Sequence, residues 1–290
     1  MSVALDSRMK ESAPIAPKSP GRPRTGHRGR LRLSFGGQQH RTVLRERFSS
    51  APFGTVRANY PDSSGTPEVE ITNPSGGILG GDHLEMDVAV EARASATVII
   101  QAANKAYRGA ESSQQAIFRV EDGAFLEYLP HHLIPYKGSD YRQTTVFHLA
   151  PEATFITWDA FAAGRVVRGE RFEFTRLRSR MEIHRGDIPE AIDGFDLPGG
   201  SEPFGGYSYS ATAYALAPRD LGPLAENVHL RLGGMVCALA SASAPASGLC
   251  GPGSGERCAS SVPCPEPLQR YSARNSGACR SRRARCGERR

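Results

Sequence analysis

A glycine-rich stretch between residues 73 and 83 is the most distinctive place in the sequence where side chains could do chemistry. Its sequence, Asn-Pro-Ser-Gly-Gly-Ile-Leu-Gly-Gly-Asp-His, puts the carboxylate of Asp82 and the imidazole of His83 directly after two glycine pairs. Glycine permits positive φ angles and close backbone approach, so the stretch could hold both side chains on a rigid edge. It is neither a Walker loop nor a dinucleotide fingerprint, because neither Gly-Lys-Ser/Thr nor a helical pattern follows. Ordinary turns between strands are an equally good interpretation.

A pair of adjacent histidines, His131 and His132, follows Pro130. Imidazole suits nickel, zinc and copper. Neighbouring side chains in a strand point to opposite faces, so both rings could bind one metal only if Pro130 ends the strand. The alternative to metal binding is that both are ordinary surface histidines held by hydrogen bonds. We keep His131 as a candidate metal contact.

A third candidate group lies between residues 158 and 170, where Asp159, Arg165, Arg168 and Glu170 are close in sequence. These charges could form ion pairs that stabilise a corner of the fold. Alternatively, inward-facing carboxylates could guide a divalent cation. Structural pairing is the safer interpretation for Arg165, whereas chemistry alone does not decide between the two for Asp159 and Glu170.

The sequence lacks the usual patterns of covalent catalysis. No Gly-x-Ser-x-Gly elbow is present, and Ser75 in Pro-Ser-Gly-Gly does not fit that pattern. All six cysteines lie from Cys237 onward, which excludes thiol catalysis in the preceding residues.

The elements that must position these residues are predicted to be strands. Residues 84–90, 116–120 and 145–149 alternate between apolar and polar side chains, which is the period of a half-buried strand. Each is followed by a short turn and a segment that begins with alanine, at Ala96, Ala124 and Ala153. A strand–turn–strand unit at a near-constant spacing of 28 to 29 residues indicates stacked coils. A β-sandwich meander is the alternative. A short helix is expected from Leu221 to Leu232.

Charge and composition divide the chain into three parts. Residues 1–28 are rich in Pro, Arg, Ser and Gly and are predicted to be a flexible basic arm. Residues 29–249 are predicted to be the β domain, and residues 250–290 a Cys/Arg-rich tail that is disordered or translated out of frame. The pI of 9.1 belongs to the ends, because residues 48–249 hold 24 acidic and 16 basic side chains.

The same features argue against several classes of protein. The longest apolar runs are far shorter than the about 20 residues that cross a bilayer. Residues 1–10 show no secretory pattern. We therefore expect a cytoplasmic protein that binds neither membrane nor nucleic acid.

Four segments, in their order and spacing, resemble the urease accessory protein family called UreD or UreH. They are residues 73–82, 101–108, 126–130 and 164–170, and the resemblance covers roughly residues 29–249. The positions that carry it, besides Asp82 and Glu170, are Asn73, Pro74, Gly76, Gly77, Gly80, Gly81, Gln101, Lys105, Tyr107, Pro130, Gly164, Arg165 and Gly169.

The resemblance implies a mainly β protein with two stacked layers of strands, arranged like a solenoid or β-helix, and one or two short helices. It implies a scaffold and not an enzyme. Such a scaffold would bind apo-urease and a helical accessory protein of the UreF type, which recruits a nickel-carrying GTPase of the UreG type. It would help to insert nickel and would hold no tightly bound cofactor, only transient Ni²⁺ in an internal channel.

The resemblance also suggests residues for that nickel path. Matched motif positions give Asp82, Asp159 and Glu170, and the chemistry of imidazole adds His83 and His131. We expect that replacing Asp82 or Glu170 lowers nickel delivery without unfolding the chain.

Two other functions compete with this one. A β-solenoid hydrolase would need paired carboxylates and aromatic side chains for sugar stacking, but the chain has one Trp. A nucleic-acid-binding protein would have to use the basic ends, and no reader motif supports it.

Overall fold

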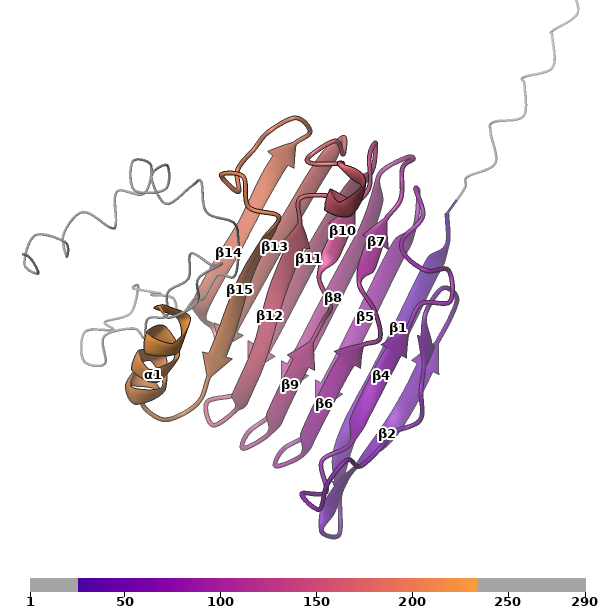
Figure 1. Cartoon of the computed structure of the whole chain (residues 1–290). Coiled ribbons are helices and arrows are strands. Elements are labelled where there is room, and N and C mark those ends of the chain that lie inside the picture. Colours follow the sequence, from indigo (N-terminus) through magenta and orange to yellow (C-terminus); the bar gives the residue numbers. More distant parts are fainter. Residues whose placement is uncertain (1–25, 234–290) are drawn as a thin grey trace, which may run out of the picture.

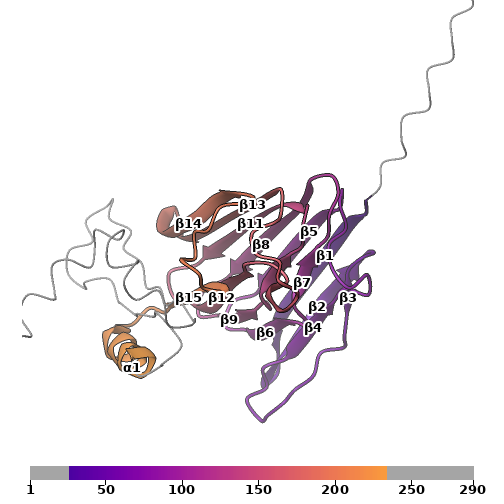
Figure 2. The same cartoon turned by 45° about the horizontal axis from the view of Figure 1, so that its top comes forward.

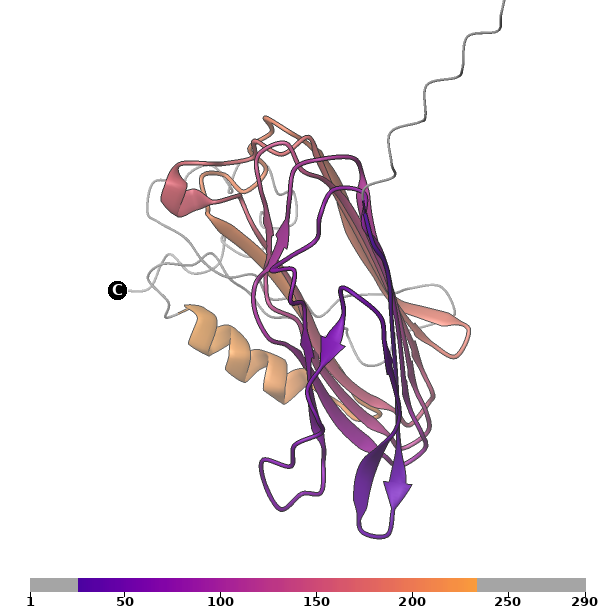
Figure 3. The ribbon, with the colours of Figure 1, turned by 90° about the vertical axis from the view of Figure 1, so that its right-hand side faces the viewer.

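The computed structural model describes residues 26–233 (Figure 1). The predicted tail at 250–290, and all but the last residues of the predicted arm at 1–28, lie outside this range. The regular structure of the described chain consists of strands in two layers, apart from one 3₁₀ turn and one helix (Figures 2 and 3). The prediction of a mainly β protein with two layers is confirmed.

The first sheet has seven strands. In spatial order they are β14 (Ile188–Pro198), β13 (Arg176–Arg185), β11 (Asp140–Leu149), β8 (Ser112–Val120), β5 (His83–Val90), β1 (Arg28–Gln38) and β2 (Arg41–Ser49). The five central strands run parallel, and β14 and β2 pair antiparallel at the two edges.

The second sheet has eight strands. In spatial order they are β3 (Gly54–Thr55), β4 (Glu68–Thr72), β6 (Ser95–Ile100), β9 (Phe125–Leu129), β12 (Thr154–Ala162), β10 (Leu133–Pro135) and β7 (Asn104–Ala106), while β15 (Tyr209–Leu216) also pairs with β12. A 3₁₀ turn, η1 (Val166–Arg168), follows β12, and the helix α1 (Gly222–Gly233) follows β15. The predicted helix at Leu221–Leu232 therefore exists, within a residue at each end.

The chain passes from one sheet to the other at regular intervals, as β5 to β6, β8 to β9 and β11 to β12. The pairing register shows that Ser95, Phe125 and Thr154 are equivalent. The alanines that match are therefore Ala94, Ala124 and Ala153. Aligning Ala96 with the other two was wrong by two residues, and the first spacing is 30 residues.

Turn geometry explains this correction. Each of the three equivalent alanines is buried, and its N–H donates to the carbonyl three residues earlier, on Glu91, Glu121 and Ala150. The alanine therefore closes the turn and starts the strand that follows it. Ala96 lies inside β6, where its small side chain is one of several inward apolar groups.

The core lies between the two sheets. Strand alternation turns Phe118 and Phe147 of the first sheet toward Phe155 and Tyr128 of the second. The Phe118 and Phe147 rings stack with centroids 4.6 Å apart, and Phe147 lies 4.3 Å from Phe155. Burying one such side chain contributes about 1.5–3 kcal/mol, so this aromatic cluster holds the two layers together.

No helix within residues 26–233 is both long and apolar enough to cross a bilayer.

Candidate functional site

Segments far apart in the sequence meet at one end of the two layers, at the top of Figure 1. We call this end the rim; it consists of residues 73–82, 101–111, 130–140 and 164–173. The strands β7 and β10 pair in parallel there, and Ile78 forms a bridge to Ala106. The Tyr136 N–H donates to the Ala106 carbonyl at 3.0 Å. Three of the four segments noted in the sequence lie within the rim, and the fourth, residues 126–130, leads into it.

The glycines of the rim are needed because backbones touch there. A Cβ on Gly80 would lie 2.6 Å from the Cα of Gly109, and one on Gly77 would lie 2.4 Å from the Lys105 carbonyl oxygen. Real Cβ atoms do not approach backbone this closely, so any side chain would push neighbouring segments apart. The glycine-rich stretch therefore forms turns packed against the next segment.

Asp82 organises the start of this stack. Its side chain is fully buried; Oδ1 accepts the His27 N–H at 2.7 Å and Oδ2 accepts the Leu79 N–H at 2.9 Å. The His27 ring also lies 3.3 Å from Oδ1. With both oxygens engaged, this carboxylate ties two backbone segments together, so we now expect its removal to destabilise the fold.

Glu170 and Arg165 form a corner of the rim. The Arg165 Nε donates to Glu170 Oε2 at 2.7 Å, and a second bond joins the Arg165 Nη2 to the other carboxylate oxygen. The guanidinium lies over the Tyr136 ring, 4.4 Å from its centroid. The Arg165 contact lowers the pKa of Glu170, so this carboxylate is ionised and neutralised by its partner. Of the two interpretations, the structure supports an ion pair at this corner.

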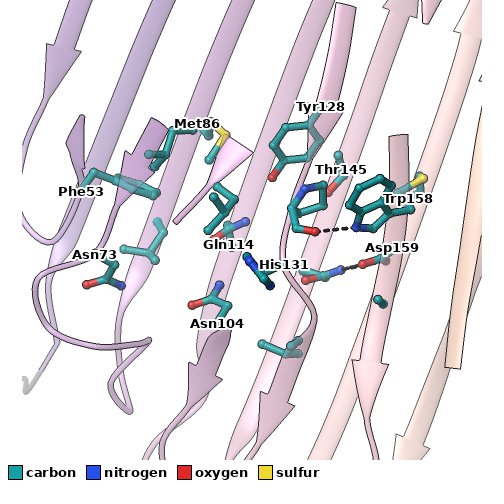
Figure 4. Close-up of a pocket in the computed structure, with 18 of the residues that line it drawn as sticks. Phe53, Asn73, Met86, Asn104, Gln114, Tyr128, His131, Thr145, Trp158 and Asp159 are labelled. Carbon is teal, nitrogen blue, oxygen red and sulfur yellow. Dashed lines mark hydrogen bonds between the residues drawn. The ribbon is translucent and has the colours of Figure 1, made fainter. Parts of the chain in front are cut away.

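A cavity between the two sheets collects polar side chains from many strands (Figure 4). Register places Gln114, Gln143 and Ser179 side by side on β8, β11 and β13, and we call these three residues the polar row. The first two line this cavity. Asn73, Asn104 and His131 come from segments of the rim. About half of the lining residues are apolar, and the polar ones offer mainly amide and hydroxyl groups, together with the imidazole of His131 and the carboxylate of Asp159.

Asp159 faces the polar row across the interior. Its oxygens accept from Gln143 Nε2 at 2.9 and 3.1 Å and from Ser179 Oγ at 3.1 Å. Burial raises the pKa of Asp159 to about 6, because the hydrogen bonds from Ser179 and Gln143 only partly offset the loss of water around the charge. The side chain is half-buried, so its charge is partly removed from water.

A second cavity begins on the other side of Asp159. It is lined by Asp193, Ser179 and Tyr214 among others, and it shares Asp159 with the first cavity. The Tyr214 hydroxyl donates to Asp193 Oδ2 at 2.6 Å. Asp193 adds negative charge that helps to raise the pKa of Asp159. Asp159 thus lines both cavities.

The other predicted residues are spread over the molecule. His83 is exposed on β5, with its Nδ1 at 2.9 Å from Ser113 Oγ. Asn73 shapes the glycine-rich turn, because it accepts the Ser75 N–H and donates to the Gly77 carbonyl. The Pro130 carbonyl accepts the Trp158 indole N–H at 2.6 Å. Of the five predicted nickel contacts, His131 and Asp159 line one cavity, and Asp82, His83 and Glu170 do not.

The remaining motif positions serve the backbone of the rim. The Gln101 N–H donates to the Ile71 carbonyl, and the Lys105 carbonyl accepts the Ile78 N–H. The Tyr107 hydroxyl contacts the Gly76 carbonyl at 3.4 Å. A Cβ on Gly164 would lie 2.8 Å from the Glu170 carbonyl oxygen. Pro74, Gly81 and Gly169 belong to turns of the same segments.

Sequence reasoning missed the polar row and Asp193. An indication was available, because Gln114 and Gln143 occupy the inward phase of strands whose other inward positions are mostly apolar. It also missed a Glu-x-x-His pair, Glu226 and His229, whose members are both exposed on α1. Within residues 26–233, no three His, Cys, Asp or Glu side chains come together as a metal site. The described interior therefore offers a cation few charged ligands at once.

Comparisons with known proteins show which family the chain is similar to. The family described as "UreD urease accessory protein" matches residues 27–284, which extends beyond the 29–249 expected from motifs. A urease accessory protein UreD of Dechloromonas aromatica is 38% identical over 177 residues, 60% of each chain. One of Picosynechococcus is 32% identical over 62% of this chain and 64% of its own length. The similarity to these two relatives thus spans less than two thirds of their length.

A third relative is similar over a longer range. Urease accessory protein UreD 2 of Streptomyces griseus is 33% identical over 235 residues, which is 76% of this chain and 78% of the relative. The family match covers most of the sequence and includes every segment of the rim. The chain therefore belongs to the UreD family of urease accessory proteins.

Proposed function

We propose that this chain is a non-enzymatic scaffold of urease maturation, which binds apo-urease and helps to deliver nickel to it. The observation that carries the proposal is membership of a family whose relatives are named urease accessory proteins. The proposed partners are apo-urease, a helical accessory protein of the UreF type and a nickel-carrying GTPase of the UreG type. A cytoplasmic location remains a prediction.

The proposed nickel path runs between the two sheets, past Asp159. Support comes from the polar row of Gln114, Gln143 and Ser179, which faces Asp159 between two cavities. A conduit must bind its ion weakly enough to release it, so amide, hydroxyl and single carboxylate oxygens suit it better than a closed cage. Nickel is cargo in this proposal, and the chain keeps no tightly bound cofactor.

Among the five residues first suggested for the path, we favour Asp159 and His131, because both line the interior cavity. The oxygens of Asp82 are occupied by backbone N–H groups, and the carboxylate of Glu170 is occupied by Arg165. His83 lies on the exposed side of its strand. A nickel role for these three would require their present contacts to be exchanged for the metal.

The alternation of parallel strands between the sheets also supports a solenoid-like description of the fold. Each coil adds one strand to each sheet, and each layer advances by about 30 residues in sequence. Such an arrangement would keep inward side chains of successive coils in rows, as the polar row requires.

Co-expression tests the proposed function. Cognate urease subunits and the two accessory partners are produced with and without this chain, and urease is assayed for nickel and for activity. We expect a complex that contains this chain and urease, and nickel in urease only when the chain is present. Full nickel loading without the chain would contradict the proposal.

A further inference from the structure

One side chain of the rim is an apolar group with no cover. Val167 is 100% exposed at the centre of η1. The turn around it is fixed on both sides, because the Gly169 N–H closes it onto the Val166 carbonyl and Arg165 pairs with Glu170. Leu79, at the other end of the rim, is 37% exposed. A rigid apolar group loses little entropy when a partner covers it.

Some positive charges of the rim have no acidic partner among the described residues. Several of its carboxylates have cationic partners, with Glu173 on Lys137 at 2.7 Å and both Glu111 and Asp140 on Arg178. By contrast, the exposed Arg108 and Arg168 form no ion pair with any residue from 26 to 233. The rim therefore presents free positive charge, although residues 48–249 are acidic as a whole.

We infer that the rim is the surface that docks onto an acidic face of apo-urease, with Val167 and Arg168 at the centre of the contact. An exposed aliphatic side chain next to the unpaired guanidinium group of Arg168 fits a protein surface that offers an apolar pocket among carboxylates. The inference rests on the proposed function, because it assigns a surface to the proposed partner.

The position of the cavity strengthens this assignment. The segments that form the rim also supply Asn73, Asn104 and His131 to the cavity lining. A partner that covers the rim would thus contact the same segments that surround the polar interior. Docking and transfer of the cation would then involve one end of the molecule.

Two double variants test the inference. Val167→Asp with Arg168→Glu inverts the polarity of the rim, and Val56→Asp with Arg57→Glu changes an equivalent exposed pair after β3, at the edge of the second sheet. Binding of the full chain to apo-urease is measured by co-purification and by titration at two salt concentrations. We expect the rim variant to bind about 30-fold or more weakly and the control within about 2-fold of the wild type.

The outcomes distinguish an error in the docking surface from an error in the proposed function. If the rim variant binds and activates urease like the wild type, the docking surface is wrong while the proposed function stands. If the wild type neither binds urease nor raises its nickel content, the proposed function itself fails. Binding of the wild type and the rim variant to phosphatidylglycerol vesicles is compared in parallel. If the rim variant loses vesicle binding but binds urease like the wild type, the rim is a membrane surface and the inference is overturned. Matching circular dichroism and melting curves verify that each variant is folded.

Discussion

The rim and the polar row between the sheets are built in different ways. In the rim, glycines and turn-forming side chains bring backbones together, as at Gly80 and Gly109. In the interior, the positions of Gln114, Gln143 and Ser179 follow from strand register alone. Motifs that are easy to see in the sequence therefore mark where the backbone needs a special shape. Some residues whose chemistry suits a cation, such as Gln143, lie outside these motifs.

Substitution of a packed glycine in the rim should have the largest effect on stability. Gly80→Ala places a Cβ against the Gly109 backbone, which cannot yield as a flexible side chain could. We expect a loss of about 3 kcal/mol in the free energy of unfolding, measured by urea denaturation. Gly37→Ala is the control, because its Cβ would meet nothing within 4 Å. Equal stability of the two variants would show that the rim is not held by close backbone contact.

Removal of the buried carboxylate in the rim should have the next largest effect. Asp82→Ala leaves the N–H groups of His27 and Leu79 without their acceptors, and an unsatisfied buried donor costs about 1–3 kcal/mol. We expect a net loss of about 2 kcal/mol in stability, with a smaller loss in Asp82→Asn because one oxygen remains. A variant that keeps wild-type stability but fails to load urease would instead restore Asp82 to the nickel path.

The interior carboxylate should show the smallest effect and the opposite sign. The pKa of Asp159 is about 6 in the folded chain, against an ordinary value of 3.8. The folded state therefore holds the proton more tightly, and Asp159 makes the protein less stable as pH rises from about 4 through 6. We expect Asp159→Asn to match the wild type near pH 4 and to be more stable by about 1 kcal/mol at pH 7–8, because Asp159 is half-buried and water screens part of the effect. Chemical denaturation at several pH values measures this difference, and a constant gap would contradict it.

Much of the fold could be predicted from the sequence. The alternation of apolar and polar side chains at residues 84–90 predicts which side of β5 is buried. A short amphipathic segment predicts α1. Exact equivalence within the repeat could not be predicted, because Ala94 and Ala96 look alike until hydrogen bonds show which one closes the turn.

The site could be predicted only in part. Asp82, Asp159 and Glu170 are equally good carboxylates in sequence. Contacts separate them, because Arg165 neutralises Glu170 and backbone N–H groups occupy Asp82, while Asp159 faces the polar row. The bonds to Asp82 and Asp159 join positions up to 55 residues apart, so local pattern does not contain them.

The nickel content of urease co-expressed with Asp159→Asn tests the central claim most directly. Asp187→Asn, in the exposed turn between β13 and β14, is the matched control. We predict that urease from the Asp187→Asn strain carries wild-type nickel, and that urease from the Asp159→Asn strain carries about 10-fold less while the chain remains folded and bound to urease. Wild-type nickel loading with Asp159→Asn would contradict a path through this interior.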